Sequence, residues 1–352
     1  MGARNRRGAM LRDGKEGRAG LSAVYKGTFT TWKKVIAFAA LSLVFFGASR
    51  GFAGTTELLF ATGGVSGTFY PLGGAIAQVW NKEVPELHVT VQATGGSMEN
   101  VRLLGSKGAE IAISMNDVAY YGQQGMEAFK AKNEKYENYS ALGNVYPDVI
   151  QIFTRKDSQV KAIGDLKGKK VSVGPPGSGT EISARQILGT YGLDYKAKNE
   201  LNPQYLSYTE AADQFKDKLI DAAYFVVAVP NSALQDINLM HPVEFLEIGD
   251  DKFGEISKAY PLYSRFTIPA NSYQGQANPV KTIGIYSSIL VRNDLPEDLV
   301  YRMTKAMYEN KSSIAQAHSA GKSLELMIAT QGIAIPIHPG AQKYYKEKGI
   351  LQ

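Results

Sequence analysis

The chain has 352 residues, no cysteine and a formal net charge of +6 at neutral pH. Residues 1–53 hold ten Lys or Arg and two Asp or Glu, so the other 299 residues carry about −2. A weakly acidic body lacks the clustered basic side chains that displace counterions from nucleic acid. Without cysteine there is no disulfide, no thiolate nucleophile and no Cys-ligated metal, which suits an oxidising extracytoplasmic compartment. Because the four histidines are far apart and lack metal-binding spacing, we expect neither a metal nor a cofactor.

The N-terminal segment is typical of a cleavable secretory signal. A lysine pair at 33–34 precedes an apolar run over residues 35–48, which is shorter than the roughly 20 residues that a membrane-spanning helix needs. Small residues end this run, so residues 1–53 are predicted to be a leader, with a mature periplasmic chain starting near Gly54. An uncleaved membrane anchor is the alternative, and the long basic stretch also allows a later start codon, for example Met10.

Short apolar runs alternate with segments of helical periodicity along the rest of the chain. The runs that predict strands are Glu57–Thr62, His88–Ala93, Ile111–Ser114, Val149–Thr154, Lys170–Val173 and Ala222–Val229. The segments that predict helices are Leu72–Glu83, Ser97–Leu104, Thr180–Tyr191, Thr209–Leu219 and Glu297–Ala317. About 300 residues exceed what one hydrophobic core usually serves. The pattern therefore predicts an α/β fold with two lobes, each a mainly parallel sheet flanked by helices.

Two longer apolar stretches, Val149–Arg155 and Thr282–Arg292, each end in a polar turn and bracket a self-contained block. We interpret them as strands that cross between the lobes, although ordinary core strands would give the same pattern. The predicted segments are, in order, lobe one (55–150), a crossover strand (about 149–156), lobe two (157–280), a second crossover strand (about 281–292) and the rest of lobe one (286–352). A ligand in such a fold lies in the cleft beyond the carboxyl ends of the strands.

Three strand-to-helix junctions are rich in Gly, Ser and Thr, at residues 61–71, 93–100 and 174–181. Each leads into a helix N-terminus, where free N–H groups and the helix dipole attract anions and glycine allows close approach. Two junctions belong to predicted lobe one and the third to lobe two, so together they would clamp a ligand from both sides. Turn glycines and N-cap serines, such as Ser97 and Ser178, explain the same pattern without a ligand.

The third junction also fits the G-x4-G frame of a phosphate-binding loop, from Gly174 to Gly179. Thr180 and Glu181 follow where Lys and Ser or Thr should stand, and a carboxylate there would repel a triphosphate. The sequence contains no Gly-x-Ser-x-Gly elbow and no convincing order of Ser, His and Asp. We therefore expect a binding protein and not an enzyme, with a small carboxylate as its ligand.

Residues at or near these junctions form the predicted ligand site. They supply backbone N–H groups, hydroxyls, amides and aromatic rings, and they are Ser66, Gly67, Thr68, Tyr70, Ser97, Asn100, Asn116, Gly177, Ser178, Gly179, Thr180, Tyr224 and Tyr273. Arg102 and Arg185 are candidate counter-charges. Each lies several residues into its predicted helix, so we expect both arginines to pair on a helix flank.

Several motifs in one order carry a family resemblance. They are Thr62–Gly64 with Gly67–Gly74, Thr94–Ser97 with Glu99 and Asn100, Asp117–Tyr121, Asp165–Lys169 leading to Gly177–Glu181, and, near the C-terminus, Ile335–Ala341 and Tyr344–Gly349. This series resembles the TAXI-family solute receptors of tripartite ATP-independent periplasmic (TRAP) transporters. In Ser114–Asp117, Met115 stands where the family often has a polar residue, which puts the exact substrate in question.

The resemblance implies a class II-type periplasmic binding fold with a ligand enclosed between two lobes. It also implies a two-part membrane permease as partner, and small acids such as glutamate, glutamine or 2-oxoglutarate as ligands. Two alternatives stay open from the sequence: a periplasmic sensor that presents its bound state to a membrane signalling receptor, and a secreted hydrolase. A neighbouring permease gene would favour transport, a histidine-kinase gene would favour sensing, and substrate turnover would favour the enzyme.

Overall fold

The computed structural model describes residues 55–198 and 200–352, so the predicted leader lies outside the described residues. The strands are β1 (Thr56–Ala61), β2 (Leu87–Gln92), β3 (Ile111–Met115), β4 (Tyr139–Arg155), β5 (Lys170–Ser172), β6 (Asn202–Gln204), β7 (Ala222–Val227), β8 (Val243–Phe245), β9 (Ser264–Ile268) and β10 (Val280–Arg292). The α-helices are α2 (Phe69–Glu83), α3 (Ser97–Gly105), α4 (Asn116–Gln124), α5 (Gly179–Thr190), α6 (Tyr208–Lys216), α7 (Ser232–Met240), α8 (Asp250–Ala259), α9 (Glu297–Glu309), α10 (Lys311–Ala317) and α11 (Pro339–Glu347). Short 3-10 helices are η1 (Glu127–Lys132), η2 (Ile163–Leu166), η3 (Ser319–Ser323) and η4 (Leu326–Ile328).

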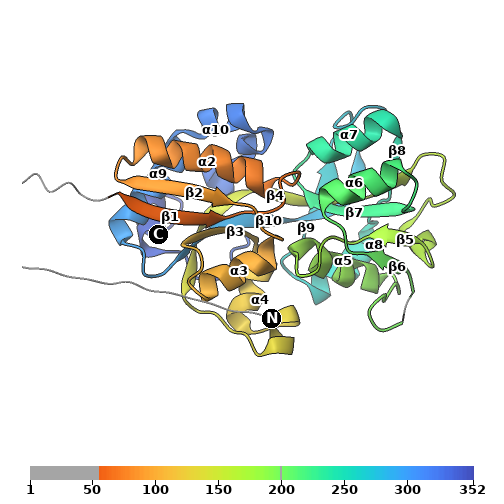
Figure 1. Ribbon diagram of the computed structural model, residues 1–352, viewed down its shortest axis with the longest axis horizontal. Coiled ribbons are helices and arrows are strands. Elements are labelled where there is room, and N and C mark those ends of the chain that lie inside the picture. The colour runs from red at the N-terminus through yellow and green to blue at the C-terminus, as the bar shows by residue number, and fades with distance from the viewer. Residues whose placement is uncertain (1–54, 199) are drawn as a thin grey trace, which may run out of the picture. The chain divides into compact units, whose positions relative to one another are not determined.

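The strands follow the order β2-β1-β3-β10-β4-β7-β5-β6, with β9 beside β10 and β8 beside β4. Strands β2, β1 and β3 pair in parallel in lobe one, and β7, β5 and β6 pair in parallel in lobe two. In Figure 1 the orange and blue helices α2, α9 and α10 gather at one end of the sheet, whereas the green helices α5 and α6 gather at the other. The predicted two-lobed α/β fold is confirmed.

Strands β4 and β10 are antiparallel partners that serve both lobes. Strand β10 pairs with β9 over residues 280–284 and with β3 over residues 287–291, and β4 pairs with β7 over residues 149–154. Strand β4 begins at Tyr139, well before the predicted apolar run. Polar Asn144 interrupts the apolar pattern in the sequence, and its side chain finds partners only in the folded chain. Its Nδ2 donates to the carbonyl oxygen of Ile328 at 2.6 Å. The lobe boundaries derived from the sequence stay a prediction.

Side-chain caps begin four of the described α-helices, namely α5, α6, α7 and α11. The hydroxyl of Ser207 accepts from the main-chain N–H of Glu210, whose carboxylate in turn accepts from the N–H of Ser207, which makes a capping box at the start of α6. The prediction of one helix over residues 297–317 was wrong, because Asn310 separates α9 from α10. The Asn310 amide donates to the carbonyl of Ala306 at 2.9 Å, and such side-chain to backbone bonding competes with helix continuation.

Aromatic side chains fill the apolar interior of each lobe. In lobe one, the rings of Phe60 and Trp80 lie 5.5 Å apart and both side chains are fully buried. In lobe two, the ring of Phe153 lies 5.3 Å from that of Phe215 and 5.1 Å from that of Phe225. Burial of one such side chain contributes about 1.5–3 kcal/mol. Each lobe thus has an aromatic cluster of its own, while another buried cluster includes residues of both lobes, such as Val101 and Ile187. No helix in the described part of the chain is both long and apolar enough to cross a membrane.

Candidate functional site

A cavity of about 260 Å³ lies where the two lobes meet. It is found beyond the carboxyl ends of β1, β2, β3 and β5, which is where ligands bind in open α/β sheets. The wall is made by Gly63, Gly64, Gly67, Thr68, Phe69, Thr94, Gly95, Gly96, Ser97, Met115, Tyr146, Asp148, Pro175, Ser178, Gly179, Thr180, Ser207, Tyr208 and Val226. The volume is below the roughly 300–1,000 Å³ of pockets for drug-sized ligands, so the space suits a small molecule.

The two junctions of lobe one are held together by side-chain hydrogen bonds. The Nδ2 of Asn100 donates to the carbonyl oxygens of Thr62 and Ile113, and its Oδ1 accepts from the hydroxyl of Thr94 at 2.7 Å. The hydroxyl of Thr62 donates to the carbonyl of Gln92 at 2.7 Å. These bonds join the carboxyl ends of β1, β2 and β3, so Asn100 positions the loops from behind the cavity wall.

The junction of lobe two depends on glycine at three positions. Gly174 and Gly177 have φ values of +89° and +78°, which are left-handed conformations that favour glycine. Gly179 packs directly against lobe one, since a Cβ there would lie 2.4 Å from the sulfur of Met115 and 2.9 Å from the hydroxyl of Ser97. The backbone of lobe two can therefore approach lobe one only where side chains are absent.

Hydroxyl groups of the first junction make contacts between the lobes. The Oγ1 of Thr68 accepts from the main-chain N–H of Ala228 at 3.0 Å. The hydroxyls of Ser66 and Thr209 lie 2.8 Å apart, and the Nδ2 of Asn231 donates to the carbonyl of Ser66 at 3.4 Å. The first junction therefore touches lobe two directly, which encloses the cavity.

Tyr208 forms part of the lobe-two wall and was missed by the sequence analysis. Its hydroxyl lies 2.6 Å from Oγ1 of Thr180 and donates to the carbonyl of Val226 at 2.9 Å. The ring thus connects the start of α5 with strand β7. The capping-box pattern from Ser207 to Glu210 marks a helix start in the sequence, and this signal could have indicated that Tyr208 lies at a strand-to-helix edge.

Asp148 of β4 is a second wall residue that the sequence analysis missed. Its side chain is buried, and its Oδ1 accepts from the hydroxyl of Tyr146 at 2.7 Å while its Oδ2 accepts from Ser287 at 2.5 Å. Burial raises the pKa of Asp148 to about 7, against the lowering effect of the two hydrogen bonds, and the nearby Asp117 carboxylate raises it further. In the sequence, the signal that could have indicated Asp148 is a carboxylate next to a long apolar run.

The cavity brings together six of the thirteen predicted ligand residues. These are Gly67, Thr68, Ser97, Ser178, Gly179 and Thr180. The hydroxyl of Ser97 accepts from the N–H of Met115 at 3.1 Å, and that of Ser178 accepts from the N–H of Glu181 at 3.0 Å as the N-cap of α5. Both serines therefore also fulfil the structural role that a turn or cap residue would have without a ligand.

The other seven predicted residues lie off the cavity wall. They are Ser66, Tyr70, Asn100, Asn116, Gly177, Tyr224 and Tyr273. Asn116, Tyr224 and Tyr273 are buried and bond to other side chains, at 2.9 Å to Asn144, 2.7 Å to Ser183 and 2.6 Å to Gln151 respectively. Tyr70 is half-buried in the first turn of α2. Nothing in a single sequence distinguishes such buried polar partners from ligand-binding groups.

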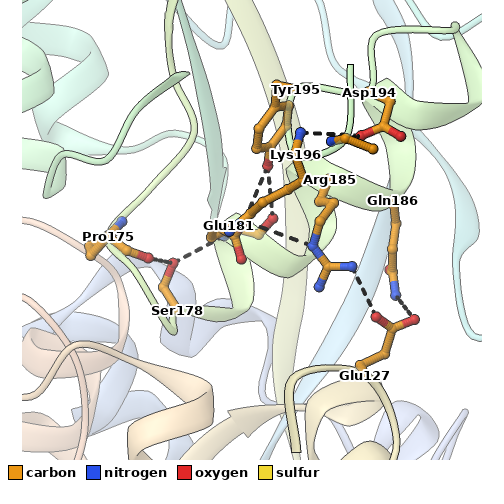
Figure 2. A network of polar contacts seen from close by, with 10 residues as sticks. Glu127, Pro175, Ser178, Glu181, Arg185, Gln186, Asp194, Tyr195 and Lys196 are labelled. Atoms are coloured by element: carbon orange, nitrogen blue, oxygen red, sulfur yellow. Dashed lines mark hydrogen bonds and ion pairs between the residues drawn. The ribbon is translucent and has the colours of Figure 1, made fainter. Parts of the chain in front are cut away.

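The two candidate counter-charges, Arg102 and Arg185, both pair on a helix flank as expected. Arg102 bonds to Glu134 at 2.8 Å, and Arg185 bonds to Glu127 of lobe one at 3.1 Å. Glu181 lies 3.3 Å from the ammonium of Lys196 and 3.8 Å from Arg185, as Figure 2 shows. Its charge is thus offset on the side of α5 away from the wall. In the part of the chain that the structure describes, no cluster of three His, Asp or Glu side chains could hold a metal ion.

The fold and the cavity define a two-lobed α/β protein with a small cavity between glycine-rich helix starts. The chain belongs to the NMT1-like family, whose model matches residues 60–349.

Three solved structures are similar to this chain. The periplasmic aliphatic sulphonate binding protein of Escherichia coli is 16% identical, with a TM-score of 0.46, and the match covers 82% of this chain and 78% of that one. The arginine-specific periplasmic binding protein of Salmonella typhimurium is 15% identical, with a TM-score of 0.45 and coverage of 77% and 100%. The binding protein component of a phosphonate ABC transporter from Pseudomonas aeruginosa is 10% identical, with a TM-score of 0.48 and coverage of 77% and 80%.

Proposed function

We propose that this chain is the extracytoplasmic solute-binding receptor of a TRAP transporter. It binds a small carboxylate, similar to glutamate, glutamine or 2-oxoglutarate, in the interlobe cavity and delivers it to the membrane permease. The observation that carries the proposal is the convergence of three glycine-rich junctions, from both lobes, on one cavity. The motif series described above supports the TRAP assignment, and the receptor itself carries out no reaction.

The proposed carboxylate position is the part of the cavity that the starts of α3 and α5 line, beside the close contact between Ser97 and Gly179. Thr180 presents its hydroxyl nearby. Helix N-terminal N–H groups and hydroxyls can hold an anion without a formal cation. Thr68 adds its hydroxyl from the first junction. The binding free energy that the ligand supplies on lobe closure would offset the free-energy cost of ordering the cavity wall.

A thermal-shift screen of the exported protein against amino acids and dicarboxylates tests this function. A ligand at 100 times its dissociation constant should add about 2.7 kcal/mol to the free energy of unfolding. Ser178→Trp fills the cavity and should abolish this stabilisation. Ser178→Ala is the matched control, because it removes the same helix cap, at a cost of about 1 kcal/mol, without filling the cavity. Equal stabilisation of the Ser178→Trp variant and the control would contradict the proposed site.

The transporter partner needs a separate test. The receptor and a candidate TRAP permease can be reconstituted in proteoliposomes with the ligand found in the screen. Uptake that requires the receptor and an imposed ion gradient is the expected result. Uptake that requires ATP hydrolysis instead would contradict the TRAP assignment while leaving the receptor function intact.

A further inference from the structure

The charge of the cavity wall restricts the ligand. Among the wall residues, which all lie in the described part of the chain, Asp148 is the only carboxylate, and none is Lys, Arg or His. A ligand that is purely anionic would enter this space without a cation to meet it and with a carboxyl group already present. A ligand that carries an ammonium group as well as a carboxylate would find a partner for each charge.

Asp148 is built to accept a further hydrogen bond. Each oxygen of the carboxylate receives one bond from the protein, from Tyr146 and from Ser287. A carboxylate offers about four acceptor positions, so each oxygen keeps capacity for another donor. The side chain is only 1% exposed, so a further donor can reach it only from within the cavity. An ionised carboxylate buried without a cation is costly, and a ligand ammonium group would remove that cost.

We propose that Asp148 determines ligand specificity by pairing with an ammonium group, so that the receptor takes α-amino acids in preference to the 2-oxo acids of the same carbon skeleton. The inference rests on the proposed function and assigns the two ends of the ligand. The carboxylate lies at the glycine-rich helix starts, and the amino group lies at Asp148 on β4.

The titration of Asp148 gives the two ligand classes opposite pH dependence. Burial raises the pKa of Asp148 to about 7, so the free carboxyl changes from protonated to ionised across neutral pH. The titratable groups that face it are Tyr146 on β4, Tyr208 on α6 and Asp117 on α4, and no Lys or Arg contributes to its shift. Burial raises the pKa of both tyrosines above 10, so they stay neutral here. Asp117, whose pKa is also raised to about 7 by burial, titrates in the same range and needs a control.

Isothermal titration calorimetry at pH 5.5 and 8.0 tests the inference, with L-glutamate and 2-oxoglutarate, and L-leucine and 4-methyl-2-oxopentanoate, as probe pairs. Each pair differs in the group on one carbon atom. We expect affinity for the amino acid to rise by about tenfold or more with pH, because its ammonium binds the ionised Asp148. Affinity for the 2-oxo acid should fall over the same interval, because ionised Asp148 repels it.

Asp148→Asn should remove both pH dependences and lower amino-acid affinity at pH 8.0 by about tenfold or more. Asp117→Asn is the matched control, since it removes the other buried carboxyl and should leave the pH dependence of ligand affinity in place.

If Asp148→Asn does not fold, the opposite pH trends of the wild-type protein still decide the matter. Tighter binding of 2-oxo acids, or an amino-acid affinity that falls with pH, would overturn the inference while the receptor function stands. No binding of any probe would count against both the proposed carboxylate class and this inference, whereas binding of an unrelated solute in the thermal screen would preserve only the receptor.

Discussion

The two places where the lobes meet are built in different ways. At the cavity, the wall consists of glycine backbone, serine and threonine hydroxyls, apolar and aromatic side chains such as Phe69 and Tyr208, and the carboxylate of Asp148. Beside it lies a contact made by charged and aromatic side chains, which we call the flanking contact. It consists of Asp117, Tyr121 and Glu127 from lobe one with Arg185, Gln186 and Tyr263 from lobe two.

The two contacts have different expected functions: the flanking contact holds the lobes together, and the cavity holds the ligand. In the flanking contact Arg185 finds its carboxylate within the protein, and Gln186 donates to Glu127 at 3.3 Å (Figure 2). The cation is thereby kept away from the cavity. At the cavity Asp148 has only hydroxyl partners, so its charge is left for a ligand to offset. Two fully buried carboxyls, Asp117 and Asp148, therefore have similar raised pKa values but different expected functions.

The largest expected effect is on the pH dependence of stability. For both carboxyls the folded state has a pKa of about 7, raised by burial from the ordinary 3.8, so the folded protein binds more protons than the unfolded chain between about pH 4 and 7. Each group should therefore lower the free energy of unfolding by up to about 1.4 kcal/mol per pH unit as pH rises through this interval. Chemical denaturation of Asp117→Asn and Asp148→Asn, without ligand, should show a shallower decline than the wild type.

Two histidines oppose this trend, so each variant must be compared with the wild type at every pH. Burial lowers the pKa of His318 and His338, which makes stability rise with pH below the ordinary histidine pKa of 6.5. Measurements with ligand distinguish the two carboxyls further, because only Asp148→Asn should alter the dependence of amino-acid binding on pH. The same ligand linkage in both variants would remove the distinction between the cavity and the flanking contact.

A smaller effect is expected at Gly179, where the backbone of lobe two packs against lobe one. Gly179→Ala places a methyl group against Met115 and Ser97, and overpacking of this kind costs about 1–3 kcal/mol. The cost falls on the closed arrangement, so ligand affinity measured by calorimetry should decrease by about tenfold or more. Gly189→Ala in the same helix meets nothing within 4 Å and should leave affinity unchanged while raising the melting temperature slightly. Equal affinities of the two variants would contradict close approach at Gly179.

The smallest effect concerns the ion pair of the flanking contact. Glu127→Gln removes the charge that pairs with Arg185, and a partly exposed pair contributes about 1 kcal/mol or less. Because this pair joins the lobes, ligand affinity should decrease by a few-fold at most. Glu134→Gln breaks the comparably exposed pair with Arg102 inside lobe one and should leave affinity unchanged. An equal loss of affinity in both variants would show that the flanking contact does not assist closure.

The sequence by itself determined many of the strands and helix starts and the glycine-rich edge of the candidate site. Apolar runs separated by helical periodicity predict the central parallel strands β3 and β7, which are buried on both faces, and also β1, β2 and β5, which are partly exposed. The glycine-rich junctions predict the edge of the cavity. In the structure Gly174 and Gly177 adopt left-handed conformations there, which other residues avoid. N-cap residues such as Ser178 predict helix starts for the same local reason.

Only the tertiary structure decided which polar groups face the cavity. Asn100 and Tyr273 have the chemistry of ligand-binding residues, yet the fold turns their polar atoms to the carbonyl oxygens of Thr62 and Ile113 and to Gln151. Asp148 stands in a strand whose pattern indicates burial, but its proximity to the start of α5 depends on how β4 crosses between the lobes. Local propensities extend over a few residues, whereas these contacts join segments that are far apart in the chain. Which side chain a buried polar group meets is therefore fixed by packing and by the need to satisfy every buried hydrogen-bonding group.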